Sequence, residues 1–588
     1  MDRDSILKMA RGWADNPYFD EDSRNEINVL LRDENINELK DRFYKDVEFG
    51  TGGMRSIIGM GRNRINKYVV RKATQALLDT VNHFFKNRDT KKVVISYDSR
   101  KFSFEFAKEV AGVVAANGCE ALIFKELTPT PILSYALLHQ KAVAGVMITA
   151  SHNPPEYNGY KAYWVDGAQV TPPYDEEIIQ AYKRIEDFSR IKSMSFEEGI
   201  KNDKIKWISD DVENDYFSHI LSKSFNHSLC LDNDRLLKVA FTPIHGTGLR
   251  SCQRAYEQLG LKQFYVVDSQ AKPDSSFSTV KLPNPEEKEA LSKVVELMLQ
   301  KNAHLAYATD PDTDRLGVVV NDNGTPVYLN GNQIALLLLN YVIKNLSDRN
   351  ELNAHSVIIK SIVTSEIQCK IAEKFNVTIK DTLTGFKWMC GLYEKLKNEN
   401  NATNLVFASE ESFGYLITDA VRDKDAVSAL SMFSEMALYY LTKDKTVLDI
   451  LNDIYTEHGF FKEGLLAINY EGLEGQEKIK RIMDFFRSFS EKSLAGSTIH
   501  KKLDFERQTT ETLNGDSVKI EDIPKSNVLG FSFENGDKVY LRPSGTEPKI
   551  KFYFLVNETE GTMAQRKINA DSKIESFKVV IEEMIDRI

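Results

Sequence analysis

Three stretches of the chain repeat one order of elements: a β-branched strand, a polar loop, an amphipathic helix and a second strand. They are KKVVISYDSRKFSFEFAKEVAGVVAANGCEALIF from residue 91, LLKVAFTPIHGTGLRSCQRAYEQLGLKQFYVV from residue 236 and SVIIKSIVTSEIQCKIAEKFNVTIK from residue 356. Units of this length favour parallel strands joined by crossover helices. Because the three copies are widely spaced, we expect three α/β domains rather than one large sheet.

The chain has 588 residues, which is too long for one hydrophobic core. The polar stretch 189–215 is typical of a linker, and a second break is expected around 444–459. Beyond it we expect paired helical segments, the hairpin DKVYLRPSGTEPKIKFYFLV and a closing amphipathic helix, which together indicate an α+β domain. The predicted domains are residues 1–207, 208–325, 326–458 and 459–588.

Composition and charge exclude several classes of function. Hydrophobic residues make up 42% of the chain and charged residues 28%, as in ordinary globular proteins. No apolar run approaches the roughly 20 residues of a membrane helix, and the first residues lack the pattern of a signal peptide. The five cysteines form no CxxC motif, which favours reduced thiols and a cytoplasmic location. A net charge of −10 argues against general nucleic-acid binding, so any anionic ligand needs a local cluster of Arg and Lys.

The stretch GVMITASHNPPEYNGYKAYW places a serine just after an apolar run. The prolines that follow end the strand, so Ser151 and His152 are expected on an exposed loop, with Lys161 ten residues further on. His152 can also be a loop residue that only caps a turn.

The stretch ATDPDTDRLGVVV alternates three carboxylates, Asp310, Asp312 and Asp314. Three such side chains can converge on one hard cation, and Mg²⁺ prefers a few carboxylates with a phosphate oxygen. A calcium-binding EF-hand loop is excluded, because its glycine and glutamate positions hold Arg315 and Asn321. A solvated acidic turn remains an alternative.

Further loops join glycine, hydroxyl groups and cations, which is chemistry suited to phosphates and sugars. Loops of this kind also occur without a ligand, so each is weak evidence alone. They are EFGTGGMRS with Arg55, TGFKW, ASEESFGY with Glu410 and Ser412, RDKD with Lys424, and RPSGTEPKIK with Arg542, Ser544, Gly545, Thr546 and Lys549.

Taken together and in this order, TASHNP, DxDxDR, ESFG and RPSGTEP resemble the signatures of the α-D-phosphohexomutase superfamily. GTGGMR, TASHNPPEYNGYK and DPDTDR are most similar to its phosphoglucomutase-2 and phosphopentomutase branch. The resemblance implies an α/β fold of four domains around a central cleft: three mixed α/β domains and a C-terminal α+β domain. It implies a phosphomutase that interconverts sugar 1-phosphate and sugar 6-phosphate through a phosphoserine and a sugar bisphosphate. Glucose is favoured, and a pentose or mannose phosphate is the alternative.

By position, the resemblance implies that Ser151 carries the phosphoryl group and, with the three aspartates, holds one Mg²⁺ per chain. Arg55, His152 and Lys161 would flank that group, with Lys161 or His152 as acid and base, and nearby cations would lower the pKa of Lys161. Sugar 1,6-bisphosphate is expected as activator and intermediate. The implied substrate contacts are Arg315, Thr384, Gly385, Glu410, Ser412, Lys424, Arg542, Ser544, Gly545 and Thr546.

Two departures from the family pattern matter. The metal loop reads DPDTDR where many members have DGDGDR, which stiffens the loop but keeps every carboxylate. The stretch YLITDAVRDKDA is no close copy of the glucose-specific branch, so the sequence leaves the identity of the sugar open.

Rival functions are weaker. There is no GK[ST] loop, no complete GxGxxG and no GxSxG, and His245 is expected to be structural. A serine phosphomonoesterase would need water access and usually a second metal cluster, which the sequence lacks. A non-catalytic sugar-phosphate binder would have lost the reactive residues, yet Ser151, Lys161 and the aspartates are present. The expected partners are small sugar phosphates, with neither nucleic acid nor membrane. The sequence does not indicate an oligomeric state.

Overall fold

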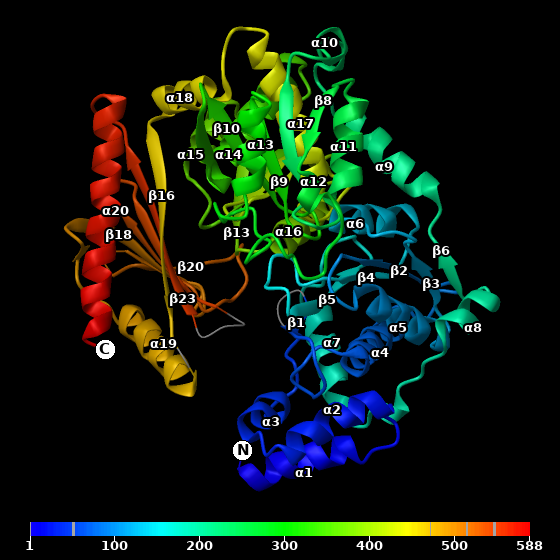
Figure 1. Cartoon of the computed structure of the whole chain (residues 1–588). Coiled ribbons are helices and arrows are strands. Elements are labelled where there is room, and N and C mark those ends of the chain that lie inside the picture. Colours follow the sequence, from blue (N-terminus) through cyan, green and yellow to red (C-terminus); the bar gives the residue numbers. More distant parts are fainter. Residues whose placement is uncertain (1, 50–52, 471, 513–514, 545–548) are drawn as a thin grey trace. The chain divides into compact units, whose positions relative to one another are not determined.

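The structure, a computed structural model, describes residues 2–49, 53–470, 472–512, 515–544 and 549–588. The chain divides into two compact units. Figure 1 labels their helices and strands. The first comprises Met1–Asn330 and Ser412–Tyr439, and the second comprises Gly331–Glu411 and Tyr440–Ile588. Two α/β domains lie in the first unit, while a third α/β domain and a β-rich C-terminal domain lie in the second. This confirms the predicted fold class, and the central cleft stays a prediction.

A six-stranded mixed sheet forms the first α/β domain. Its elements are β1 (Met54–Ile57), α4 (Lys67–Phe84), β2 (Lys92–Tyr97), α5 (Ser103–Ala116), β3 (Glu120–Ile123), α6 (Thr130–His139), β4 (Ala144–Ile148), β5 (Tyr157–Trp164), α7 (Tyr174–Arg184), α8 (Phe196–Lys201) and β6 (Ile205–Trp207). The strand order is β1-β5-β4-β2-β3-β6. β2 runs parallel to β3 and β4, whereas β5 runs antiparallel to β4 and β1. The first predicted strand–helix–strand unit is therefore confirmed as β2-α5-β3.

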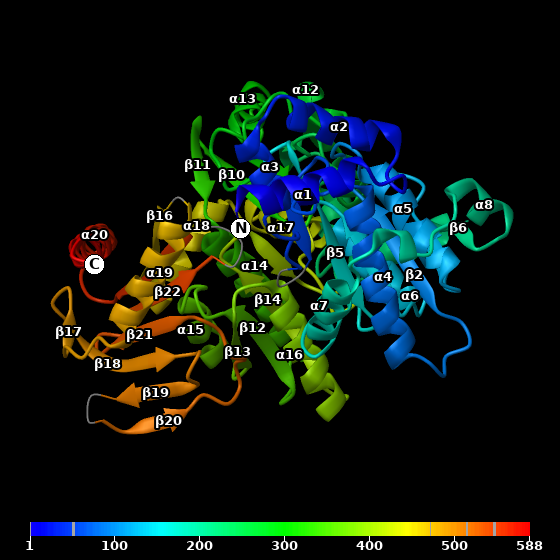
Figure 2. The same cartoon turned by 90° about the horizontal axis from the view of Figure 1, so that it is seen from below.

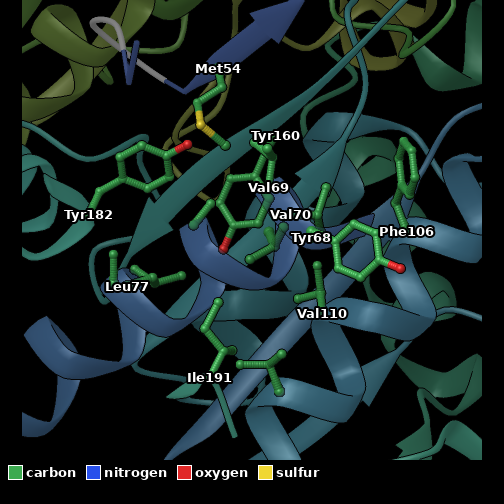
Figure 3. Close-up of a cluster of buried hydrophobic side chains, with 14 of the residues drawn as sticks. Met54, Tyr68, Val69, Val70, Leu77, Phe106, Val110, Tyr160, Tyr182 and Ile191 are labelled. Carbon is green, nitrogen blue, oxygen red and sulfur yellow. The ribbon is translucent and has the colours of Figure 1, made fainter. Parts of the chain in front are cut away.

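The core of this domain lies where its helices meet the sheet. Figure 3 shows Tyr68 and Leu77 of α4, Phe106 of α5, Tyr160 of β5 and Tyr182 of α7 within one cluster of buried side chains. These five side chains come from four elements spread over residues 67–184. Burial of large apolar and aromatic groups is the main stabilising contribution to such a domain.

Three helices precede the first sheet and extend this core: α1 (Arg3–Ala14), α2 (Glu21–Arg32) and α3 (Ile36–Phe43). The Trp13 ring stacks on Phe19, with centroids 4.0 Å apart, and meets the edge of Tyr68 on α4 at 6.0 Å. Asp20 accepts hydrogen bonds from the Tyr68 hydroxyl and the Ser23 backbone N–H, at 2.9 Å each. Aromatic packing and this half-buried polar contact join the N-terminal helices to the first domain.

Helix α3 also holds the turn that follows β1. Arg42 donates from Nη1 to the carbonyl oxygen of Met60 at 2.9 Å, and Glu26 Oε1 accepts from the Met60 N–H at 3.0 Å. Arg42 and Glu26 form an ion pair. Since β1 carries Arg55, the N-terminal helices support the strand that presents this residue.

The polar stretch 189–215, expected to be a linker, is folded. It contains a 3₁₀ turn (Phe188–Arg190), α8, β6 and the start of α9 (Asp210–Ser222). Ile205 of β6 is only 1% exposed and pairs with Ala121 of β3, while the Phe196 and Trp207 rings meet at 5.6 Å. The linker prediction was wrong because a few apolar residues among many charged ones suffice to complete a sheet edge.

A five-stranded sheet forms the second domain. After α9, its elements are α10 (His227–Asp232), β7 (Lys238–Thr242), α11 (Gly248–Gln258), β8 (Gln263–Val266), α12 (Asp268–Ala271), α13 (Ser292–Gln300), β9 (Leu305–Thr309), β10 (Leu316–Asp322) and β11 (Thr325–Leu329). The strand order is β11-β10-β9-β7-β8, with β7 parallel to β8 and β9. This confirms the second predicted strand–helix–strand repeat.

The first of the two compact units is completed by β15 (Gly414–Leu416), and most of α17 (Ala426–Leu441) also belongs to it.

The third α/β domain opens the second unit. Its elements are α14 (Gly331–Asp348), β12 (Ser356–Ser361), α15 (Ile367–Lys374), β13 (Thr378–Thr382), α16 (Phe386–Glu399), β14 (Asn404–Glu410) and α18 (Val447–His458). β12 runs parallel to β13 and to β14, which confirms the third predicted unit. The segment 444–459, where a break was expected, contains α18, which begins with a capping box between Thr446 and Asp449, so the expected break is confined to the end of this helix.

The C-terminal domain is mostly antiparallel sheet (Figure 2). Its elements are β16 (Phe460–Asn469), α19 (Gly472–Arg487), β17 (Ser493–Leu494), β18 (Ser497–Asp504), β19 (Thr509–Thr512), β20 (Ser517–Lys519), β21 (Leu529–Phe533), β22 (Lys538–Pro543), β23 (Lys549–Glu558) and α20 (Met563–Asp586). The predicted hairpin is confirmed as β22 and β23, and the closing helix as α20, which packs on β16 and β23. Paired helices were expected first, but residues 460–469 form a strand that pairs along its whole length with β23.

The third and C-terminal domains share a hydrophobic cluster. Ile362 and Leu383 of the third domain pack with Phe505, Tyr540 and Tyr553 of the C-terminal domain. Among the described residues, none of the helices combines the length and apolarity needed to cross a bilayer.

A glycine on α5 tests whether the 189–215 stretch is firmly packed. A Cβ atom on Gly112 would lie 2.3 Å from the carbonyl oxygen of Met194, so the Gly112→Ala protein should lose about 1–3 kcal/mol of stability. Gly12→Ala, which meets nothing within 4 Å on α1, should be neutral or stabilising by up to about 1 kcal/mol. Differential scanning calorimetry of both variants checks this. Equal transition temperatures would show that the stretch is loosely attached.

Candidate active site

Ser151 lies in the loop between β4 and β5. The sequence analysis expected this serine to be exposed, but it is buried. Only 1% of it is accessible, and its φ of 51° lies in the left-handed region. Its Oγ donates to Asp310 Oδ2 at 2.7 Å, and its N–H donates to Thr149 Oγ1 at 2.7 Å. The serine is covered because the loop after β9 packs on it. The structure therefore joins the serine loop of the first domain to the aspartate loop of the second.

His152 and Arg55 lie beside the serine. His152 Nδ1 is 3.2 Å from Ser151 Oγ, and Arg55 Nη1 donates to Asn153 Oδ1 at 3.2 Å. Removal from solvent, and then the cations of Arg315 and Arg55, hold the pKa of His152 well below its ordinary value of 6.5. The imidazole is thus neutral at neutral pH, and one of its ring nitrogens can accept a hydrogen bond.

Asp310, Asp312 and Asp314 converge on one point. They are at most 1% exposed, and one carboxylate oxygen from each lies within 4.8 Å of the others. Burial, and then the carboxylates of Asp314 and Asp312, raise the pKa of Asp310 well above its ordinary value. Oδ1 of Asp312 and Oδ1 of Asp314 are buried without a hydrogen-bond partner among the described residues. These features rule out a solvated acidic turn, and they fit a site for a hard divalent cation.

Two lysines lie against Asp310, Asp312 and Asp314, the aspartate triad. Lys161 Nζ is 2.6 Å from Asp312 Oδ2 and 3.1 Å from Asp314 Oδ2, and Lys424 Nζ is also 3.1 Å from Asp314 Oδ2. Burial alone would lower the pKa of Lys161, but Asp312 and Asp314 outweigh it and hold the pKa above its ordinary value. The predicted lowering was therefore wrong for this structure, because the nearest charges are carboxylates.

Arg315 and Ser412 complete the predicted residues of the first unit. The Arg315 N–H donates to Asp310 Oδ1 at 3.1 Å, and its guanidinium forms an ion pair with Glu286. Ser412 is half-buried, two residues before Gly414, which forms a bridge with Arg315.

Two threonines, which the sequence analysis missed, fix the aspartate loop. Thr130, the first residue of α6, donates from its N–H to the Asp312 carbonyl at 2.9 Å and from Oγ1 to Asp312 Oδ2 at 2.8 Å. Thr247 donates from its N–H to the Pro311 carbonyl at 2.9 Å, and its hydroxyl is 2.7 Å from that of Thr313. The glycine-rich TPIHGTG stretch was the available sequence signal for Thr247, because glycines mark close backbone approach.

His245, in the same loop, has the structural role expected of it. Its Nδ1 is 3.0 Å from the Lys272 carbonyl oxygen, and its Nε2 is 2.9 Å from Thr279 Oγ1. The ring thus holds the chain after α12 through both of its nitrogens.

The remaining predicted residues lie in the second unit. Gly385, at a φ of 111° that favours glycine, donates from its N–H to Glu410 Oε2 at 3.2 Å, next to Thr384. Arg542 lies opposite Lys551 in the β22–β23 hairpin, and the Ser544 N–H donates to the Lys549 carbonyl at 2.7 Å. Gly545 and Thr546 lie outside the described residues.

The sequence matches the definitions of phosphoglucomutase/phosphomannomutase α/β/α domain I at residues 46–188, domain II at 214–324 and domain III at 330–458. A phosphoglucomutase of Staphylococcus saprophyticus is 37% identical over 538 residues, which covers 89% of this chain and 95% of that protein. The chain belongs to the phosphoglucomutase/phosphomannomutase family. The resemblance stated from the motifs is thereby confirmed. As a family member, the protein is a sugar phosphomutase, an isomerase.

Other comparisons agree with this family. A phosphoglucomutase of Staphylococcus aureus strain MRSA252 is 36% identical over 534 residues, covering 91% of this chain and 94% of that protein. A phosphoglucomutase/phosphomannomutase family protein of Burkholderia thailandensis has the same fold, with a TM-score of 0.63 at 18% identity over 90% of this chain and 97% of that one. Paramecium parafusin (phosphoglucomutase) gives 0.64 at 17% identity over 92% and 96%.

The contact between the 242–248 loop and the aspartate loop leads to a test. A Cβ atom on Gly246 would lie 2.5 Å from Pro311 Cα and 2.6 Å from its carbonyl oxygen, so Gly246→Ala must displace the aspartate loop. Supporting contacts of this kind are worth about 10–100-fold in metal affinity, and we expect a loss of that size. Calorimetric titration with Mg²⁺ or Mn²⁺ measures it, with Gly12→Ala as the control. Unchanged affinity would place the cation away from the triad.

Proposed function

We propose that the protein interconverts glucose 1-phosphate and glucose 6-phosphate, with Ser151 as the residue that carries the phosphoryl group. The observation that carries this proposal is the buried Ser151 hydroxyl, 2.7 Å from Asp310 of the triad. The staphylococcal relatives are phosphoglucomutases, which supports glucose over mannose or pentose. Activity mainly on mannose or pentose phosphate is the alternative.

The proposed reaction has two phosphoryl transfers. First the P–Oγ bond of phosphorylated Ser151 breaks and a bond forms to the free hydroxyl oxygen of the sugar monophosphate, giving sugar 1,6-bisphosphate. The bisphosphate then turns, and its other phosphoryl group moves to Ser151 Oγ. One Mg²⁺, held by Asp310, Asp312, Asp314 and the Ser151 side chain, would neutralise phosphoryl charge. Arg55, which lies beside this loop, would add a second positive charge.

Lys161 is proposed to take the proton of the sugar hydroxyl and return it after transfer. Its Nζ lies beside the carboxylates next to Ser151, and those carboxylates set its proton affinity. The base form becomes accessible once Asp312 and Asp314 are neutralised by another cation. His152 is neutral and close to Ser151 Oγ, so we assign it the orientation of that oxygen, with general base catalysis as the alternative.

The substrate contacts are proposed from the family pattern. Arg542 and Ser544, with Gly545 and Thr546, would bind the phosphate that is not reacting, since arginine forms paired hydrogen bonds to phosphate. Buried Glu410, held by Gly385, would accept hydrogen bonds from sugar hydroxyls. The remaining proposed contacts are Arg315, Thr384, Ser412 and Lys424.

We also propose the domain boundaries 1–207, 208–325, 326–458 and 459–588. Three features support them: β6 ends at Trp207, α18 ends at His458 and β16 begins at Phe460. The second boundary has no such support, because it falls after the first residue of β11 (Thr325–Leu329), and this strand pairs with β10 of the second sheet.

Phosphorylation of Ser151 is the decisive test. After incubation with glucose 1,6-bisphosphate, intact-mass and peptide analysis should find one phosphate, on Ser151. Ser151→Ala should lose turnover, whereas Ser572→Ala, an exposed serine on α20, should keep it. Assays on glucose, mannose and ribose 1-phosphate, with and without catalytic bisphosphate, identify the sugar. Phosphate on another residue, or turnover by Ser151→Ala, would exclude the assignment.

Arg542→Ala tests the proposed distal phosphate site. Loss of a charge-assisted contact of a few kcal/mol should lower kcat/KM about 100-fold. The bisphosphate should also leave before it turns, and the exposed phosphoserine should hydrolyse faster. Product isomer, free bisphosphate and inorganic phosphate are measured together, with Arg507→Ala on the same domain as the control. Unchanged KM and no bisphosphate release would mean that the distal site lies elsewhere.

A further inference from the structure

The guanidinium of Arg100 is surrounded by backbone carbonyls of the serine loop. Its Nη1 donates to the Pro154 and Tyr157 carbonyls at 2.8 and 2.9 Å, and its Nη2 donates to the Ser151 carbonyl at 2.5 Å and to the Asn153 carbonyl. All four acceptors belong to residues 151–157. One side chain therefore contacts four residues spread along the segment between the end of β4 and the start of β5.

Arg100 is itself held in place. Asp98 Oδ1 accepts the Arg100 N–H at 2.9 Å, and Asp98 Oδ2 accepts the Thr149 hydroxyl at 2.6 Å. Thr149 in turn accepts the Ser151 N–H, so Asp98 is linked to the loop through both Arg100 and Thr149. The Arg100 side chain has no exposed surface, and the Phe277 ring of the second domain lies 5.0 Å from its guanidinium carbon.

This arrangement matters because two features of the loop require support from outside it. Pro154 and Pro155 lack an N–H group and cannot form the ladder hydrogen bonds of a sheet. Ser151 has a left-handed backbone, which a residue other than glycine keeps only when its surroundings enforce it. A planar guanidinium has five donors in a fixed fork, whereas a lysine ammonium has three and cannot span four carbonyls.

We propose that Arg100 is the positioning residue that keeps the 151–157 loop in one conformation through both phosphoryl transfers. Arg100 contacts no reacting atom, and it acts through the carbonyl of Ser151 and its neighbours. The inference rests on the proposed function in one respect, that Ser151 is the phosphorylated residue. Asp98 and Phe277 support the same contact from two different domains.

Arg100→Lys and Arg100→Met test this proposal. Loosening the loop should misplace Ser151 Oγ and lower kcat about 100-fold, while KM for the sugar phosphate, held by other residues, stays within about twofold. The phosphoserine should hydrolyse faster, because water reaches a loosened loop. Hydrogen exchange of peptides covering 151–157 should rise in the unphosphorylated protein, which needs no assumption about the reaction. Lysine should retain more activity than methionine.

Two controls separate positioning from general stability. Arg88→Met removes a half-buried arginine whose guanidinium donates to the carbonyl of Lys141, and it should change none of these readouts. Ile95→Ala removes a fully buried side chain of β2 and lowers the stability of the same sheet without touching the loop. If Ile95→Ala shortens the phosphoserine lifetime as much as an Arg100 variant of equal melting temperature, the positioning role is excluded.

The outcomes distinguish this inference from the proposed function. If wild-type protein is phosphorylated at Ser151 and Arg100→Lys keeps its kcat, phosphoserine lifetime and loop exchange, the inference fails alone. If wild type is not phosphorylated at Ser151, the proposed function fails, and loop exchange still decides whether Arg100 holds the segment. If neither Arg100 variant folds, Phe277→Leu decides: it should raise loop exchange and shorten the phosphoserine lifetime, and no change in either would overturn the inference.

Discussion

The structure around Ser151 depends on three carboxylates buried within a few ångströms of one another. Asp310, Asp312 and Asp314 repel each other strongly in a region with little water, and the protein offsets this with Lys161 and Lys424. Thr130 and Thr247 then fix the loop from two sides. The negative charge of the three carboxylates destabilises the folded protein. The same charge suits the site to a divalent cation, which in turn would neutralise the charge of a phosphoryl group. Burial of the serine follows from this arrangement, because its hydroxyl belongs to the same cluster of hydrogen bonds.

The sequence predicted the repeated elements well because they are encoded locally. β-branched strands, an amphipathic helix and a turn lie within about 30 residues in each copy, and their periodicity is visible without knowing the partners. Residues 460–469 were misread because their character as a strand comes from pairing with β23, almost 90 residues later. The folded stretch 189–215 was missed for a related reason, since Ile205 gains its place from β3 and not from its neighbours.

In the candidate site, too, residues in local motifs were predicted, and residues that depend on distant partners were not. Ser151 and the aspartates were found because each lies in a compact motif, whereas Thr130 contacts Asp312 across 182 residues and has no local mark. Arg100 was missed because its partners are carbonyl oxygens, which every residue possesses and no sequence pattern identifies. The burial of Ser151 and the raised pKa of Lys161 were also out of reach, since both depend on which charges and loops the fold brings into contact.

The N-terminal helices give this enzyme a dependence that the family definition does not contain. That definition begins at residue 46, yet Glu26 and Arg42, both before it, hold Met60 in the turn behind the strand of Arg55. A protein shortened to begin at residue 46 would keep every residue proposed for catalysis. It would lose the contacts from Glu26 and Arg42 that support the strand of Arg55. In this chain the support of the catalytic module therefore begins at least 20 residues before its family signature, at Glu26.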